Sequence, residues 1–98
     1  MKASSAAISE AVYACIDQVN RMLPHEARLA KDPSTVLVGE GGVLDSLALI
    51  NLLVNLEEAL RSRLGLECAV LDEALLSDLE GPYRSVGQLA AWIAERAA

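Results

Sequence analysis

The stretch that decides the fold is residues 42–65, GVLDSLALINLLVNLEEALRSRLG. Within it, leucines recur every three or four residues, which is the spacing of one face of an α-helix. Asp45 or Ser46 is well placed to cap the start of that helix, and Gly65 is free to adopt the left-handed conformation that ends one. The pattern therefore predicts a long helix over residues 46–64, with a core-facing stripe of Leu49, Leu53, Leu56, Leu60 and Leu64.

Two further helical patterns flank this one. Residues 6–23 carry apolar side chains at helical spacing, and Pro24 ends the pattern because the residue before a proline avoids the α region. The stripe of this first helix consists of Ile8, Val12, Cys15, Ile16, Val19, Met22 and Leu23. Near the end of the chain, Ser85 is placed to cap a last helix. Its expected apolar face is Val86, Leu89, Ala90 and Ile93.

The connections between these helices differ in character. Residues 24–45 form a long loop, and within it residues 36–38 (VLV) look strand-like but have no evident pairing partner. We interpret them as loop, anchored to the core by Leu37. Residues 71–79 predict a short helix. At 98 residues, with 53% hydrophobic residues and no Phe, the chain predicts a single all-α domain over residues 1–98. The expected architecture is an antiparallel four-helix bundle of three long helices and a short third one.

The net charge and the hydropathy of the chain restrict the classes of partner that it is expected to bind. The net charge is −6, and residues 40–80 hold nine acidic residues against Arg61 and Arg63. This balance argues against a nucleic-acid partner, because a phosphate backbone is bound by neutralising it with Lys and Arg. No apolar run is long enough to cross a bilayer, and the start of the chain has no apolar targeting segment. We therefore expect a cytoplasmic monomer with no membrane partner.

A conventional active site is not evident. His25 is the single histidine, and it has no metal-spaced partner and no nucleophile motif beside it. The glycines of residues 39–42 lack the strand and the Lys-Ser/Thr pair of a nucleotide-binding loop. Cys15 and Cys68 lie far apart without metal-ligand spacing. Cys15 is expected to be an inert buried thiol, and Cys68 has no assigned role. The chain is therefore predicted not to be an enzyme.

Ser46 is the residue best placed for a covalent modification. It stands at the head of the strongest helix, directly after the glycine-rich loop. A serine there is exposed, and the unpaired backbone N–H groups of a helix N-terminus make its surroundings electropositive. A phosphodiester built on it would lie in a favourable field. The alternative is that Ser46 or Asp45 simply caps the helix.

Residues 42–65 resemble the core of the acyl and peptidyl carrier protein family, which has an Asp-Ser-Leu at the head of its second helix, then a Glu-Glu pair and a closing glycine. Residues 42–46 are particularly similar to the D-alanyl and aminoacyl carrier branch. The resemblance implies that a phosphopantetheinyl transferase, using Mg²⁺, attaches 4′-phosphopantetheine from coenzyme A to Ser46. Asp45 is then the acidic neighbour that helps the transferase to hold its metal. The implied partner face consists of Leu47, Ile50, Val54, Glu57 and Glu58.

The same resemblance implies that the chain carries a thioester-bound cargo from one enzyme to another. An acyl- or aminoacyl-loading ligase or an acyltransferase would load a thioester cargo onto the arm, and a downstream transferase would remove it. Fatty-acid carriers usually have acids at the positions of Ala48 and Asn51 and a phenylalanine at that of Leu60, and residues 66–81 are longer than usual. These departures favour an amino acid or a short acyl group of a specialised biosynthetic pathway. A fatty-acid or polyketide chain is the alternative cargo, and a carrier-fold adaptor without an arm is the alternative of another class.

Overall fold

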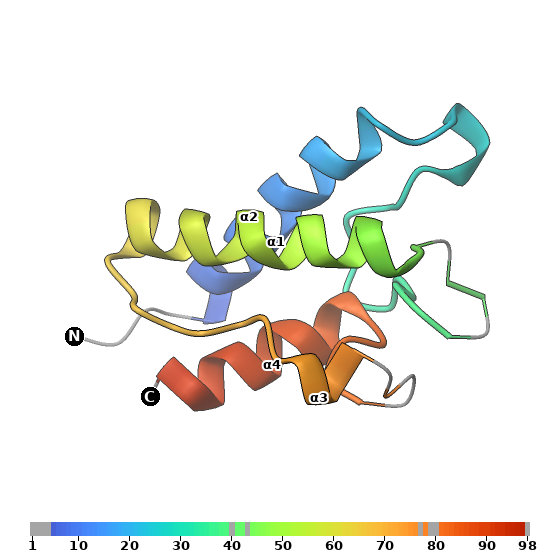
Figure 1. Cartoon of the computed structure of the whole chain (residues 1–98). Helices are drawn as coiled ribbons and strands as arrows, with labels where there is room; N and C mark the ends of the chain where they lie inside the picture. Colours follow the sequence, from blue (N-terminus) through green and yellow to red (C-terminus); the bar gives the residue numbers. More distant parts are fainter. Residues whose placement is uncertain (1–4, 40, 43, 77, 79–80, 98) are drawn as a thin grey trace.

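Helix α2, Ser46–Leu64, has the bounds that the leucine spacing predicts, and Gly65 follows it with a φ of 65°. The computed structural model describes residues 5–39, 41–42, 44–76, 78 and 81–97. Its other elements are α1 (Ser5–Asn20), the short 3-10 helix η1 (His25–Ala27), α3 (Glu73–Leu76) and α4 (Val86–Ala97). Helix α1 packs against both α2 and α4, and it runs in the opposite general direction to both (Figure 1). The described residues therefore confirm a compact all-α domain with three long helices and a short one.

The core combines the apolar faces of the three long helices. On α2 the predicted leucines are buried except Leu64, which is half-buried, and Leu52 is fully buried as well. The buried face of α2 is thus wider than the predicted stripe, as is usual for a helix of a globular core. The other two helices contribute Ile8, Ala11, Val12, Cys15, Ile16 and Val19 from α1, and Val86, Leu89 and Ile93 from α4.

Helix α1 ends earlier than predicted. The α-helix stops at Asn20, and the N–H groups of residues 21–23 donate to carbonyls three residues back, at 2.9–3.3 Å. Such bonds tighten the last turn of a helix and rotate its side chains off the α-helical register. The prediction that Met22 belongs to the core stripe is wrong, because its side chain is 77% exposed.

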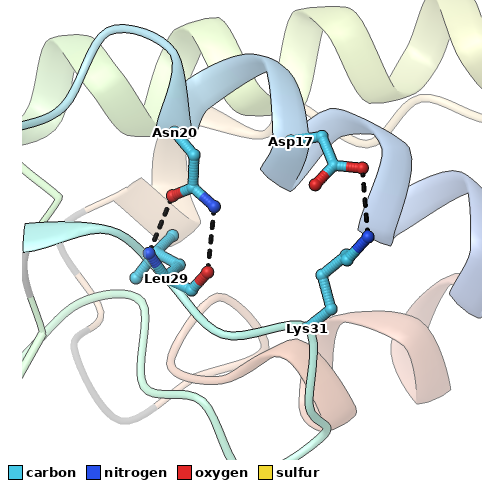
Figure 2. Close-up of polar contacts among 4 residues, drawn as sticks. All are labelled: Asp17, Asn20, Leu29 and Lys31. Carbon is cyan, nitrogen blue, oxygen red and sulfur yellow. Dashed lines mark hydrogen bonds and ion pairs between the residues drawn. The ribbon is translucent and has the colours of Figure 1, made fainter. Parts of the chain in front are cut away.

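The end of α1 also fastens the long connection (Figure 2). The Asn20 side-chain amide donates to the Leu29 carbonyl at 2.9 Å, and its oxygen accepts from the Leu29 N–H at 2.7 Å. Nearby, the Lys31 ammonium lies 3.3 Å from the Asp17 carboxylate, in an ion pair whose side chains are about half exposed. Exposed pairs contribute at most about 1 kcal/mol, so the Asn20 contact is the stronger attachment.

Residues 36–38 do have a pairing partner. Val36 forms an isolated antiparallel bridge with Ser85, and the Leu37 N–H donates to the Arg84 carbonyl at 2.7 Å. The partner segment is the residue run that leads into α4, about fifty residues away along the chain. The expectation of an unpaired loop is therefore wrong, whereas the anchoring role of Leu37 is confirmed by its complete burial.

Tyr83 holds the segment after α2 against α4. Its ring is fully buried, and its hydroxyl donates to the Val70 carbonyl and accepts from the Asp72 N–H at 2.9 Å. Its ring also meets Trp92 of α4 edge to face, with 5.8 Å between ring centroids. One side chain thus joins residues 70–72 to the last helix.

Helix α3 is shorter than the predicted 71–79. It begins at Glu73, after Asp72, whose carboxylate accepts from the Ala74 N–H at 3.0 Å, and it ends at Leu76. Ser77 and Leu79, within the predicted range, lie outside the described residues.

Candidate functional site

Ser46 is the first residue of α2 and not its cap. Asp45 precedes it with an extended backbone (φ −84°, ψ 179°), and the Asp45 side chain accepts a hydrogen bond from the Ala48 N–H at 2.8 Å. The Ser46 side chain is exposed and has no hydrogen-bond partner among the residues that the structure describes. Of the two capping alternatives, Asp45 is the correct one. The Ser46 hydroxyl therefore takes no part in capping α2.

The first turn of α2 also has free backbone donors. Within the described part of the chain, the N–H groups of Ser46 and Leu47 have no acceptor. Helix α4 differs, since the N–H groups of Val86 and Gly87 donate to loop carbonyls at 3.0 and 2.8 Å. Unpaired N–H groups at a helix start carry partial positive charge and favour an anion. An anion bound to the Ser46 oxygen would lie at such a start.

The loop before Ser46 is held to the core. Leu44 is buried, and its N–H donates to the Leu37 carbonyl at 3.2 Å. Gly42 lies so close to Val38 that a Cβ at residue 42 would stand 2.6 Å from the Val38 Cα atom. Only glycine permits that approach. The glycine of the motif thus has a steric role, and it helps to fix the loop that presents Ser46.

The apolar side chains of the predicted partner face are on the surface. Leu47 is 68% exposed, Val54 is 48% exposed and Ile50 is half-buried. All three lie away from the buried leucines of α2, as the spacing predicts. Met22 joins Leu47 and Val54 as the exposed large apolar residues of the described chain.

The two glutamates of that predicted face have other contacts. One carboxylate oxygen of Glu57 accepts from the N–H groups of Val70 and Leu71, both at 2.8 Å. Glu58 is exposed and lies 3.0 Å from the Arg61 guanidinium. Glu57 therefore fastens the segment that follows α2, a structural role that the sequence did not predict, and Glu58 is partly neutralised.

A shallow groove of about 200 Å³ lies between the end of α1 and the first turns of α2, and Ser46 is not one of its lining residues. Its lining residues are Val19, Met22, Leu23, Asp45, Leu47, Ala48 and Asn51. Sequence reasoning missed this groove because it depends on the tightened end of α1, which turns Met22 outward.

The remaining groups considered in the sequence are His25 and the two cysteines. His25 is exposed at the start of η1, and the described residues contain no group of three or more His, Cys, Asp or Glu side chains that could hold a metal ion. Cys15 is buried as predicted, and burial raises the pKa of its thiol to about 11. Cys68 is half-buried. No helix formed by the described residues is long and apolar enough to span a membrane.

Comparisons with known proteins identify no relative of this chain. No protein-family model, curated protein or solved structure matches the chain.

Proposed function

We propose that the chain is a free-standing carrier protein that bears a 4′-phosphopantetheine arm on Ser46. The observation that carries the proposal is the exposed, unbonded hydroxyl of Ser46 at the start of α2, with Asp45 performing the capping. When bound, the arm supplies a thiol that holds an acyl or aminoacyl group as a thioester. The all-α arrangement around α1 is in keeping with the antiparallel bundle of carrier proteins.

The residues around Ser46 fit a phosphodiester. In the attachment reaction the Ser46 oxygen forms a bond to the phosphorus that carries pantetheine in coenzyme A, the bond from that phosphorus to the nucleotide portion breaks, and the hydroxyl proton is lost. The product places a negative charge beside the unpaired N–H groups of Ser46 and Leu47, where the helix dipole stabilises it. Asp45 keeps one carboxylate oxygen for its cap, and the other is available to the metal of the transferase.

Ser46 is also distinct from the other serines whose side chains the structure describes. The hydroxyl of Ser34 donates to Asp32 at 2.6 Å, and that of Ser85 is bonded to Gln88 at 2.9 Å. Ser9 and Ser62 lie within α1 and α2, away from a helix start. Among these side chains, only that of Ser46 combines exposure, a free hydroxyl and a helix N-terminus.

The carrier would meet its partners through the exposed apolar residues beside Ser46. Leu47, Ile50 and Val54 are proposed to contact the phosphopantetheinyl transferase, the loading ligase or acyltransferase, and the downstream transferase. Glu57 is expected to contribute little, because its carboxylate is engaged with residues 70 and 71. Apolar contact would then account for more of the binding than charge.

The proposed cargo is an amino acid or a short acyl group, with a fatty-acid or polyketide chain as the alternative. This choice rests on Ala48 and Asn51, which stand where fatty-acid carriers usually have acidic residues. The chain itself would do no chemistry on the cargo, and we infer a monomer that works in the cytoplasm.

The decisive test is an intact-mass measurement of the chain after incubation with coenzyme A, Mg²⁺ and a promiscuous phosphopantetheinyl transferase. We expect a mass gain equal to one arm. A chain that stays unmodified under conditions in which a known carrier is fully converted would instead support an adaptor without a prosthetic group.

A further inference from the structure

Ser46 stands on a turn of α2 that the core does not hold directly. Residues 45–47 are exposed, and Ala48 is half-buried. The nearest buried residues along the chain are Leu44 on one side and Leu49 on the other. Because the end of a helix frays where few buried contacts hold it, the position of Ser46 depends on how firmly Leu44 is fixed.

Leu37 makes the contact that fixes Leu44. Its carbonyl accepts from the Leu44 N–H at 3.2 Å, and its own N–H donates to the Arg84 carbonyl at 2.7 Å. Its side chain is fully buried in the core. One residue therefore joins the segment that leads into α4 to the residue two positions before Ser46.

The loop between Leu37 and Leu44 is tightly closed as well. The Gly42 N–H donates to the Gly39 carbonyl at 2.9 Å, and a Cβ on Gly42 would stand 2.6 Å from the Val38 Cα atom. Close contact of this kind leaves the loop little freedom to adjust if one of its ends is displaced. A shift of Leu37 would therefore carry Leu44 with it, and with Leu44 the start of α2.

We propose, on the basis of the carrier function above, that Leu37 is a positioning residue for the attachment of the arm. Its side chain is buried, so it acts through Leu44 and not on the reacting atoms. By holding Leu44 it keeps the first turn of α2, and the Ser46 hydroxyl on that turn, in one orientation. Orientation matters here because a misplacement of about 1 Å can slow a reaction about a hundredfold.

Leu60 offers a matched comparison for Leu37. It is also fully buried, but it lies near the other end of α2 from Ser46. Its carbonyl accepts from Leu66, beyond the end of the helix, at 3.1 Å. Leu37→Ala and Leu60→Ala remove the same atoms from the core, so both should lower the melting temperature. They differ in their connection to the start of α2.

The test measures the kinetics of arm attachment by a promiscuous phosphopantetheinyl transferase with coenzyme A and Mg²⁺, at a temperature at which circular dichroism shows each variant folded. Leu37→Ala should lower kcat by about tenfold or more, whereas Leu60→Ala should change it by less than about twofold. KM should change little in both, because Ile50 and Val54 of the proposed partner face lie beyond the first turn of α2. Leu37→Met, which roughly conserves the side-chain volume, should keep the rate of the unaltered protein.

Two further measurements follow the same link. Hydrogen exchange at the amides of Leu44 and Ala48 should be faster in the Leu37→Ala protein and unchanged in the Leu60→Ala protein. Gly42→Ala, which forces a Cβ into the neighbouring backbone, should also slow attachment, and it does so without removing a core side chain. Gly42→Ala therefore decides the question if Leu37→Ala does not fold.

The outcomes separate the positioning role from the carrier function itself. Equal attachment rates for Leu37→Ala and Leu60→Ala, or an unchanged rate for Gly42→Ala, would overturn the role of Leu37 while the carrier function stands. A rise in KM at unchanged kcat would also overturn it, because Leu37 would then shape the surface that the transferase binds. If the unaltered protein receives no arm, both proposals fail.

Discussion

The side chain of Asp45 accepts a hydrogen bond from the backbone N–H of Ala48 at 2.8 Å and so caps helix α2. Ser46, between them in sequence, takes no part in that contact. Asp45 therefore supplies the capping contact and Ser46 the proposed attachment site. A substitution can remove either one and leave the other in place.

The first prediction follows from this division. Asp45→Ala should lower the free energy of unfolding by about 1 kcal/mol, the usual cost of losing an N-cap side chain. Ser46→Ala should change the free energy of unfolding by less than about 0.5 kcal/mol, as is usual for an exposed residue whose side chain makes no capping contact. Urea denaturation of the two variants measures both values. A larger loss for Ser46→Ala than for Asp45→Ala would mean that Ser46 is the cap.

The second prediction compares two leucines of the same helix. Leu56 is fully buried and Leu47 is 68% exposed. Leu56→Ala should cost about 2–5 kcal/mol through lost burial and the cavity left behind, whereas Leu47→Ala should cost little and weaken loading by partner enzymes instead. Thermal melts and loading rates measured on both variants check this. Similar destabilisation by the two substitutions would show that both faces of α2 are buried, leaving no face for partners.

The third prediction concerns the Glu57 contacts with Val70 and Leu71. Glu57→Ala removes a charged acceptor from two backbone N–H groups and should cost about 1.5–3 kcal/mol. Glu58→Ala breaks only an exposed pair with Arg61 and should cost at most about 1 kcal/mol.

Amide hydrogen exchange gives the local readout for the third prediction. The N–H groups of Val70 and Leu71 should exchange faster in the Glu57→Ala protein and remain unchanged in the Glu58→Ala protein. Unaltered exchange at both amides in the Glu57→Ala protein would show that Glu57 does not hold this segment.

The fourth prediction is a loss of stability at alkaline pH. Burial raises the pKa of the Cys15 thiol from 9.0 to about 11, against a smaller opposing effect of Arg63. Between these values the unfolded chain loses the proton and the folded chain keeps it, so the free energy of unfolding falls as pH rises from about 9 to about 11. Each pKa unit corresponds to about 1.4 kcal/mol, which sets the fall at no more than about 3 kcal/mol.

Variants at Cys15 and Tyr83 test the origin of that loss. Burial also raises the pKa of the Tyr83 hydroxyl, which adds to the alkaline destabilisation. Cys15→Ala should therefore flatten the pH dependence of stability, and a further Tyr83→Phe change should flatten it more, although both lower stability at neutral pH. A pH profile that keeps its full slope in the double variant would rule out these two groups as the cause.

The sequence predicted α2 well because its signals are local. The leucine spacing, Asp45 before the helix and Gly65 after it lie within one short stretch, and each acts through contacts a few residues long. The choice between Asp45 and Ser46 as cap could not be made, because both residue types suit that position and only the backbone geometry distinguishes them.

The parts that sequence reasoning missed depend on contacts between distant residues. The Tyr83 hydroxyl meets Val70, and Val36 pairs with Ser85, and neither contact leaves a periodic pattern in the sequence. Glu57 looked like a surface acid because the N–H groups that donate to its carboxylate come from a segment after the helix. The groove between α1 and α2 depends on the tightened end of α1, which the helical spacing of Met22 did not reveal.

The central claim is tested most directly by locating the arm on the chain. The protein, Ser46→Ala and the control Ser62→Ala, which alters an exposed serine of the same helix, would each be treated with coenzyme A, Mg²⁺ and a phosphopantetheinyl transferase, digested and analysed by mass spectrometry. We expect the arm on residue 46 of the unaltered protein and of Ser62→Ala, and no mass gain in a Ser46→Ala protein of unchanged helical content. An arm that still attaches to Ser46→Ala, or that maps to another residue, would contradict the account.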